Sequence, residues 1–185
     1  LTPAGQRLVD EARKVLVAAN EFEHCADELK DPMAGEVHMG LIPTLAPYVL
    51  PLIMPALYKA LPKLQFYLYE LKTLELMSQL ESGKLDILIL PYLEGMDNYD
   101  CYDLFVEELL LATYKGHPLS KKKNCTLASL EGHHVLTLED GHCLRDQSLD
   151  YCFAAGAEED GHYQATSLET LRHMVSGGAG ITLLP

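Results

Sequence analysis

The sequence predicts an α/β protein with doubly wound parallel sheets in two lobes, preceded by a long N-terminal helix. Three observations support this fold class. From Glu36 onward, strand-like runs alternate with helical segments, a succession typical of parallel sheets covered by helices. The succession starts again near residues 106 to 110, which predicts a second lobe and a cleft between the lobes. The first 30 residues instead show a seven-residue repeat.

The segment 1–30 is predicted to be a linker and dimerisation helix. Thr2 suits an N-cap, and Pro3 suits the first helical position. Large side chains recur every seven residues with alanines between them, as in helices that pack on a second helix. The helix would be roughly 42 Å long, more than a small domain needs, although an amphipathic helix packed on its own domain is the alternative. The seam consists of Leu8, Ala12, Val15, Ala19, Phe22, Ala26 and Leu29.

Hydrophobic periodicity divides the remainder into a lobe at 36–106 and a lobe at 107–185. The predicted elements of the first lobe are a strand at 37–41, a helix at 44–61 broken or kinked by prolines, a strand at 64–68, a helix at 73–80 and a buried strand at 87–90. Those of the second lobe are strands at 109–114, 134–138, 161–165 and 181–184, a cysteine-containing helix, and a helix that begins with the capping box Thr166-Ser167-Leu168-Glu169.

Composition limits the function. The 185 residues are 48% hydrophobic and carry a net charge of −13, so this chain alone is not expected to bind the phosphates of DNA or RNA. We expect no membrane span, because no run of about 18 apolar residues occurs. Five cysteines without the spacing of a disulfide framework favour a reducing, cytoplasmic compartment, where a disulfide is more often a signal than a structural bond. Gly177–Gly180 precedes a strand, so it is no nucleotide fingerprint, and we expect no cofactor.

The stretch 138–153 contains the residues with the clearest chemistry. Gly141 ends an apolar run and helical spacing follows, which places Cys143 near a helix N-terminus. Unpaired backbone N–H groups and the helix dipole favour an anion there, and the thiolate is the nucleophilic form of cysteine. His142 can donate a proton and Arg145 adds a positive charge. We therefore expect a thiol that reacts with peroxide.

Cys152 follows Cys143 by nine residues. In an intact helix their Cα atoms would be about 13 Å apart, whereas a disulfide needs roughly 4.4 to 6.8 Å. A bond between them would require the segment to unwind, which is the logic of a redox switch. The alternative is two inert core thiols, because cysteine is among the most buried residue types.

Several phrases resemble the LysR-type transcriptional regulators. Leu1–Gly5 followed by a long helix resembles their linker helix, and further phrases resemble their effector domain, namely Gly35–Gly40, Ser82–Asp86 and Gly180–Pro185. The stretches 138–147, 152–153 and 165–172 resemble the members of that family that sense hydrogen peroxide. The resemblance covers essentially the whole chain.

The resemblance implies a two-lobed regulatory domain of the type 2 periplasmic-binding-protein fold. It implies that Cys143 is the peroxidatic cysteine and Cys152 the resolving cysteine. By position, the peroxide pocket would be formed by Thr44, Thr73, His142, Arg145 and Asp146, and His162 and Arg172 fall in matching stretches. No metal is implied.

The implied partners are hydrogen peroxide, a thiol–disulfide reductant and further copies of the chain in a homodimer or tetramer. DNA would be bound only through a winged helix-turn-helix preceding Leu1, and RNA polymerase only by the full-length protein. The family also has a segment that returns to complete the first lobe, so a chain ending at Pro185 is expected to be C-terminally truncated.

Three alternatives remain. The chain could be an effector domain that binds a small molecule between its lobes, with incidental cysteines. It could be a thiol peroxidase, although we expect a sensor, not an enzyme, because one signal consumes one chain. A zinc site from His142, Cys143, Cys152 and His162 is the third, but its spacing matches none of the usual patterns.

Overall fold

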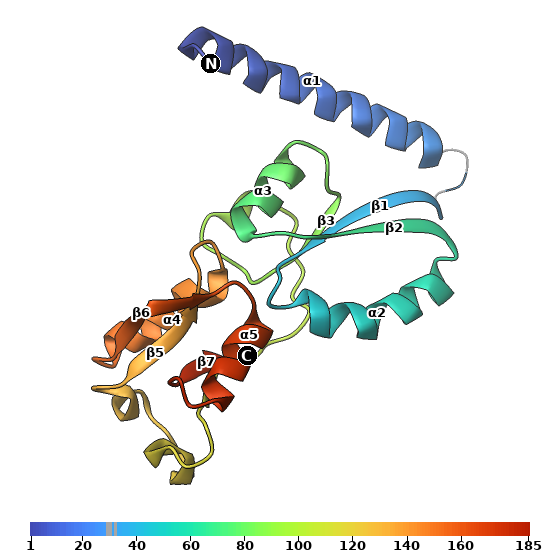
Figure 1. Cartoon of the computed structure of the whole chain (residues 1–185). Helices are drawn as coiled ribbons and strands as arrows, with labels where there is room; N and C mark the ends of the chain where they lie inside the picture. Colours follow the sequence, from blue (N-terminus) through green and yellow to red (C-terminus); the bar gives the residue numbers. More distant parts are fainter. Residues whose placement is uncertain (29–30, 32) are drawn as a thin grey trace. The chain divides into compact units, whose positions relative to one another are not determined.

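The computed structural model describes residues 1–28, 31 and 33–185 (Figure 1). They form two compact units, Leu1–Leu90 and Pro91–Pro185. Residues 91–106, which the sequence analysis assigned to the first lobe, group with the second unit. None of the helices in the described ranges is long and apolar enough to cross a membrane.

The first unit contains a parallel sheet with the strand order β2-β1-β3. Its elements are α1 (Pro3–Glu28), β1 (Ala34–Leu41), α2 (Ala46–Ala60), β2 (Lys63–Glu70), α3 (Thr73–Glu81) and β3 (Ile87–Ile89). The side chains of Met39 and Leu41 pack with α2. Gly40, which points to the other face, leaves room for Leu76 of α3, because a Cβ there would lie 2.5 Å from Leu76 Cδ2. The helices thus cover opposite faces, and the doubly wound prediction is confirmed for this unit (Figure 1).

The structure shows no break in the helix predicted at 44–61, and the strand predicted at 87–90 is not buried. Helix α2 runs unbroken through Pro51 and Pro55. Together with Pro47 these prolines are four residues apart on the exposed side, where carbonyl groups that lose their helical partner can bind water. The strand at 87–90 was predicted to be buried, but Ile87 is 46% exposed in β3.

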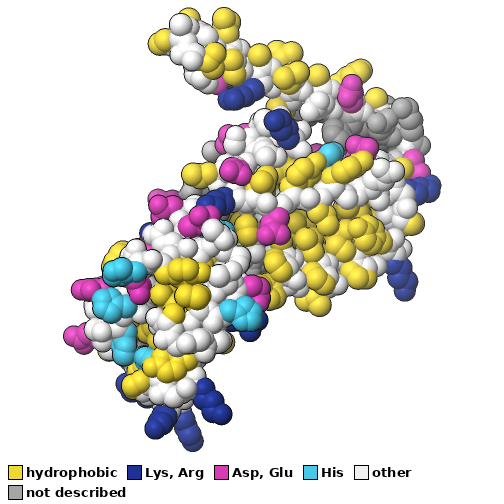
Figure 2. All heavy atoms as spheres, in the orientation of Figure 1, with side chains coloured by type: hydrophobic (Ala, Val, Ile, Leu, Met, Phe, Trp, Pro, Cys, Tyr) yellow, Lys and Arg dark blue, Asp and Glu magenta, His cyan; other side chains and the backbone are white. Residues whose placement is uncertain are grey.

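The predicted seam of α1 is uncovered in the single chain. Leu8, Val15 and Phe22 are 72%, 69% and 75% exposed, and Figure 2 shows apolar side chains along this helix. Leu29 of the predicted seam lies outside the described residues. A hydrogen bond of 3.3 Å from Asn20 Nδ2 to the carbonyl oxygen of Gly83, the glycine that follows α3, joins α1 to its own unit.

The second unit consists of short strands and two helices. Its elements are the 3-10 helix η1 (Met96–Asn98), β4 (Leu110–Ala112), the 3-10 helices η2 (Pro118–Lys121) and η3 (Leu127–Leu130), β5 (His134–Leu138), α4 (Cys143–Ala154), β6 (Glu158–Ala165), α5 (Leu168–Ser176) and β7 (Thr182–Leu184). Strands β5 and β6 are parallel, as predicted. Strands β4 and β7 are antiparallel, so the prediction of purely parallel sheets was wrong for this pair.

A hydrogen-bonded bridge connects the two strand pairs of this unit. Val135 and Ile181 form a parallel bridge, and the amide of Leu136 donates to the carbonyl of Ile181 at 2.8 Å. Thr182 Oγ1 donates to the carbonyl of Leu136 at 2.7 Å. The capping box was predicted one residue too early: Ser167, and not Thr166, is the N-cap of α5 and accepts from the amide of Thr170.

Candidate functional site

Helix α4 holds both cysteines of interest. Gly141, with φ +91°, turns the chain after β5, His142 is the N-cap in extended conformation, and Cys143 is the first helical residue. The predicted position of Cys143 at a helix N-terminus is therefore confirmed. Its side chain is buried but not sealed, because 6% of the residue is exposed. The unpaired first-turn amides and the dipole of α4 favour a negative charge at this end of the helix.

Cys152 lies near the other end of the same helix and is fully buried. It is 0% exposed, and the apolar cluster around it consists of Leu119, Leu130, Val135, Ala157, Ile181 and Leu183. Burial raises the pKa of the Cys152 thiol, and the negative charge of Glu159 raises it further. The amide of Ala157 donates to the carbonyl of Cys152 at 2.9 Å, which fixes this end of the helix.

Both cysteines are thiols in this structure. Nine helical steps put their Cα atoms about 13 Å apart, well beyond the reach of a disulfide. The helical separation predicted from the spacing is confirmed, since α4 is continuous from Cys143 to Ala154. Of these two cysteines, only Cys143 has any access to solvent.

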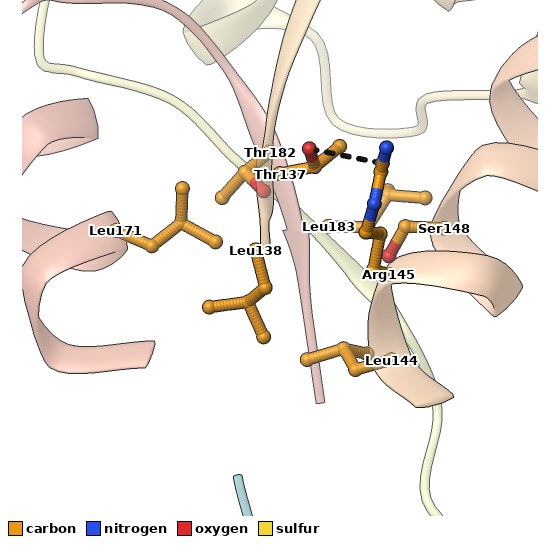
Figure 3. A pocket seen from close by; sticks show the side chains of 8 residues that line it. All are labelled: Thr137, Leu138, Leu144, Arg145, Ser148, Leu171, Thr182 and Leu183. Carbon is orange, nitrogen blue, oxygen red and sulfur yellow. Dashed lines mark hydrogen bonds between the residues drawn. The ribbon is translucent and has the colours of Figure 1, made fainter. Parts of the chain in front are cut away.

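The buried side chain of Arg145 is the centre of an ionic cluster. Its Nε donates to Asp140 Oδ1 at 2.8 Å, and its Nη1 and Nη2 donate to the two carboxylate oxygens of Glu159 at 2.5 and 3.2 Å. Thr137 Oγ1 donates to Glu159 Oε1 at 2.6 Å. It also accepts from Arg145 Nη1 at 3.5 Å, the bond drawn in Figure 3. Desolvation lowers the pKa of Arg145, but the two carboxylates outweigh it and raise the pKa overall.

This pairing changes what Arg145 can do for the thiol. The sequence predicted a positive charge beside Cys143, whereas two carboxylates compensate that charge in the structure. The guanidinium binds α4 to β5 and β6, and it adds little net positive field. Sequence reasoning missed Glu159 and Thr137. A carboxylate fourteen positions from Arg145 cannot be assigned to it without the register of β5 and β6, which pairs Val135 with Glu159.

The interior under α4 is packed. The gap there has no room for a water molecule, and Figure 3 shows its lining: Thr137, Leu138, Leu144, Arg145, Ser148, Leu171, Thr182 and Leu183. Ser148 on the inner side of α4 is itself only 4% exposed. A small molecule therefore has no room beneath the helix.

The other predicted site residues of this unit lie in different surroundings. His142 is 4% exposed, and its Nε2 lies 4.0 Å from Glu139 Oε1. Asp146 is exposed in the first turn of α4. The side chain of His162 is fully exposed and its Nδ1 lies 3.1 Å from Asp160 Oδ1. Arg172 is on α5 and pairs with Glu169 at 2.7 Å. Among the predicted pocket residues of the second unit, His142 is the one that is a sequence neighbour of Cys143, at the N-terminus of α4.

Thr44 and Thr73 occupy equivalent places in the first unit. Leu41 of β1 pairs with Glu70 of β2, and each threonine follows its strand by three residues. Because the strands are parallel, both hydroxyls lie at the same carboxyl edge of the sheet, where α/β proteins bind ligands. They are 6% and 8% exposed, and Thr73 Oγ1 has no hydrogen-bond partner among the described residues. A buried hydroxyl without a partner favours a small polar ligand at this edge.

In the described part of the chain, no group of three or more His, Cys, Asp or Glu side chains is arranged to hold a metal ion. The zinc alternative would need His162, whose imidazole is solvent-exposed and associated with Asp160.

Comparison with known proteins identifies relatives over the full length of the chain. The chain is 50% identical over 184 residues to the "DNA-binding transcriptional dual regulator OxyR" of Escherichia coli strain K12. This alignment covers 100% of the chain and 60% of that protein. The chain is 46% identical over 184 residues to the "Hydrogen peroxide-inducible genes activator" of Haemophilus influenzae, covering 100% and 61%. The chain therefore spans about three fifths of the length of these curated relatives.

Two solved structures share the fold. The oxidized form of OxyR matches with a TM-score of 0.74 and 52% identity, over 83% of this chain and 72% of that chain. The reduced form matches with a TM-score of 0.72 and 48% identity, over 83% and 71%. The expected regulatory-domain fold of the type 2 periplasmic-binding-protein kind is confirmed. The LysR substrate binding domain matches residues 30–185, and the chain therefore belongs to the LysR family.

Proposed function

We propose that this chain is the redox-sensing regulatory part of a LysR-type transcription regulator. Hydrogen peroxide oxidises Cys143, and the product forms a disulfide with Cys152 that changes the conformation and thereby the transcription of oxidative-stress genes. One observation carries the proposal: two buried thiols occupy opposite ends of one helix, so a bond between them cannot form while α4 is intact. Similar proteins carry the name "Hydrogen peroxide-inducible genes activator", which supports the same stimulus.

The first chemical step takes place at Cys143. Its thiolate attacks one oxygen of hydrogen peroxide, the O–O bond breaks, and the sulfur loses two electrons to become a sulfenic acid. The leaving hydroxide takes a proton from His142 or a bound water and departs as water. The helix N-terminus favours the thiolate, since the first-turn amides and the helix dipole stabilise a negative charge at this end of α4.

The second step forms the disulfide. The Cys152 sulfur attacks the Cys143 sulfur, the S–O bond breaks, and the leaving hydroxide combines with the Cys152 proton as water. Two thiols and one peroxide thus give one disulfide and two waters. A thiol–disulfide reductant restores the thiols. The chain is then a sensor and not an enzyme, because each signal oxidises one chain once.

For the peroxide pocket we propose Thr44, Thr73, His142, Arg145 and Asp146, with His162 and Arg172 as further candidates. Thr44 and Thr73 have the strongest support, because their buried hydroxyls share one sheet edge and the hydroxyl of Thr73 lacks a partner in the described structure. Arg145 and Asp146 have less: the charge of Arg145 is compensated by Glu159 and Asp140, and Asp146 is exposed.

The remaining proposals concern the whole protein. The uncovered apolar side of α1 supports association with a second copy of the chain, as a homodimer or within a tetramer. DNA binding, contact with RNA polymerase and a cytoplasmic location are proposed for the full-length regulator, by analogy with relatives named as transcription regulators.

The test is peptide-mapped mass spectrometry after a brief, near-stoichiometric pulse of hydrogen peroxide, with free thiols trapped. We expect a linkage between Cys143 and Cys152 with a loss of about two mass units, while the exposed Cys125 stays reduced. Cys143→Ser should abolish the response and Cys125→Ser should preserve it. Oxidation spread evenly over all cysteines would contradict the proposal.

A second candidate is a domain that binds a small-molecule inducer, favoured by the match to the LysR substrate binding domain. In that case Cys143→Ser would leave the response of the full regulator to peroxide unchanged. A thiol peroxidase, by contrast, would turn over many peroxide molecules per chain in the presence of a reductant.

A further inference from the structure

We propose that Glu159 is a positioning residue of the switch: its carboxylate tethers Arg145 and so holds the N-terminal turn of α4, and this tether must open before the two sulfurs can meet. The inference rests on the proposed function, because it concerns the step that converts the sulfenic acid of Cys143 into the disulfide.

The tether is built mainly by Glu159. Its two carboxylate oxygens face the two terminal nitrogens of Arg145, at 2.5 and 3.2 Å, which is the bidentate arrangement that binds guanidinium groups most strongly. The side chains are only 10% and 19% exposed, and Thr137 Oγ1 fixes the carboxylate at 2.6 Å. Asp140 also bonds Arg145, but its side chain is 89% exposed, so water screens that pair.

The tether acts on the end of α4 that we infer to move. Histidine, the N-cap of α4, is not among the residues that cap helices well, so the first turn depends on the burial of Leu144 and on Arg145. The other end is held by the fully buried Cys152 and by the bond from the amide of Ala157 to its carbonyl. The cheaper movement brings Cys143 toward Cys152, and it carries Arg145, two residues further on, away from Glu159.

The gated step is the second one. The Cys152 sulfur attacks the Cys143 sulfur, an S–S bond forms, the S–O bond breaks, and hydroxide leaves with the thiol proton as water. Glu159 restrains this step a second time, because its charge adds to burial in raising the pKa of Cys152 and keeps that thiol protonated while α4 is docked. The first step, peroxide attack at Cys143, needs no opening of the tether.

The experiment compares Glu159→Gln with Glu158→Gln in the chain 1–185. Glu158 is the neighbouring carboxylate on β6 with a side chain 79% exposed, so its replacement removes the same charge without touching Arg145. Rapid quenching and mass spectrometry give the rate of disulfide formation. Sulfenic acid formation is measured by dimedone trapping in a Cys152→Ala background, with and without Glu159→Gln.

We expect Glu159→Gln to accelerate disulfide formation about tenfold, a change typical of losing one charged hydrogen-bonded contact. Sulfenic acid formation and the behaviour of Glu158→Gln should stay at the wild-type level. Because the tether is present in the dithiol form and absent from the disulfide form, its loss destabilises the dithiol form relative to the disulfide form. The reduction potential should therefore become more negative by about 30 mV, the equivalent of a tenfold change for a two-electron couple.

Two further variants separate gating from general destabilisation. Val175→Ala opens a cavity in the core cluster that also contains Leu144, but it leaves Arg145 and Glu159 in place, so it should accelerate the disulfide step less than Glu159→Gln does. Glu159→Asp keeps the charge and should give a smaller acceleration than Glu159→Gln. If Glu159→Gln does not fold, the rate of disulfide formation in Glu159→Asp is compared with the wild-type rate instead.

The outcomes are distinct. A wild-type chain that forms neither sulfenic acid nor disulfide would refute the proposed function itself. A wild-type chain that forms the disulfide, with Glu159→Gln or Glu159→Asp forming it at the same rate, would refute the tether and indicate that the Cys152 end moves. If Val175→Ala accelerated disulfide formation as much as Glu159→Gln, Glu159 would act only through the stability of the fold, and the tether would be refuted.

Discussion

Replacing Cys152 by serine is the usual way to remove a resolving thiol, and here it should weaken the fold. Cys152 is 0% exposed and packs in an apolar cluster with Val135 and Ile181. A serine hydroxyl in the same place would lose its hydration, which costs about 1–3 kcal/mol when no good partner compensates it. A bond back to the helix carbonyl of Ser148 would recover part of this. We expect the free energy of unfolding of the second unit to fall by about 1–3 kcal/mol.

The measurement is hydrogen exchange in increasing urea under reducing conditions, followed by mass spectrometry of the peptide that contains β5. Val135 in β5 belongs to the same cluster and is 0% exposed, so its strand reports the stability of that core. Cys125→Ser is the matched control, because the thiol of Cys125 is exposed and its replacement should change stability by less than about 0.5 kcal/mol. Equal stabilities of the two serine variants would refute the burial argument.

Two more predictions concern His117 and Thr73. His117 is 8% exposed, its Nδ1 accepts from the amide of Leu119 at 3.2 Å, and burial, followed by the nearby His133, lowers its pKa below the ordinary 6.5. The unfolded chain then binds the proton first, so this contribution to stability is present above about pH 6.5 and is lost as pH falls below it. The urea midpoint of the second unit should drop between pH 7.5 and pH 5.5, and less so in His117→Gln; an equal drop in both would count against this assignment. Thr73→Val removes a buried hydroxyl without a partner in the described structure, so stability should be retained or rise by about 1 kcal/mol while dimedone-trapped sulfenic acid forms more slowly; loss of stability with an unchanged rate would show that the hydroxyl serves the fold.

The first turn of α4 was predictable because local chemistry determines it. Gly141 supplies a left-handed turn, and a helix begins directly after it, so the residue order alone assigns Cys143 to the N-terminus. The same locality explains the correct assignment of β1 and β2, because large apolar residues occupy every second position of both segments in the sequence. Features that depend on neighbours in sequence are the predictable ones.

Features that depend on tertiary register could not be predicted. The pairing of Arg145 with Glu159 requires that β5 and β6 align Val135 with Glu159, and the register then shifts before Thr137 pairs with Gln164. The prolines of α2 misled for a related reason: the buried side of that helix, packed on β1 and β2, stabilises it despite the missing amides on its exposed side. Tertiary burial outweighed local propensity in both places.

The different burial of the two thiols determines the order of the two steps in the proposed switch. Cys143 is the thiol with access to solvent, so peroxide reaches it first, while Cys152 is sealed in the core until α4 loosens. A helix of twelve residues has little stability of its own and depends on its docked side chains, namely those of Leu144, Arg145 and Cys152. Oxidation of Cys143 leaves these contacts in place, so the delay between sensing and switching is set by the strength of docking. In the proposed switch, the timing therefore depends on residues such as Glu159 that take no part in the reaction with peroxide.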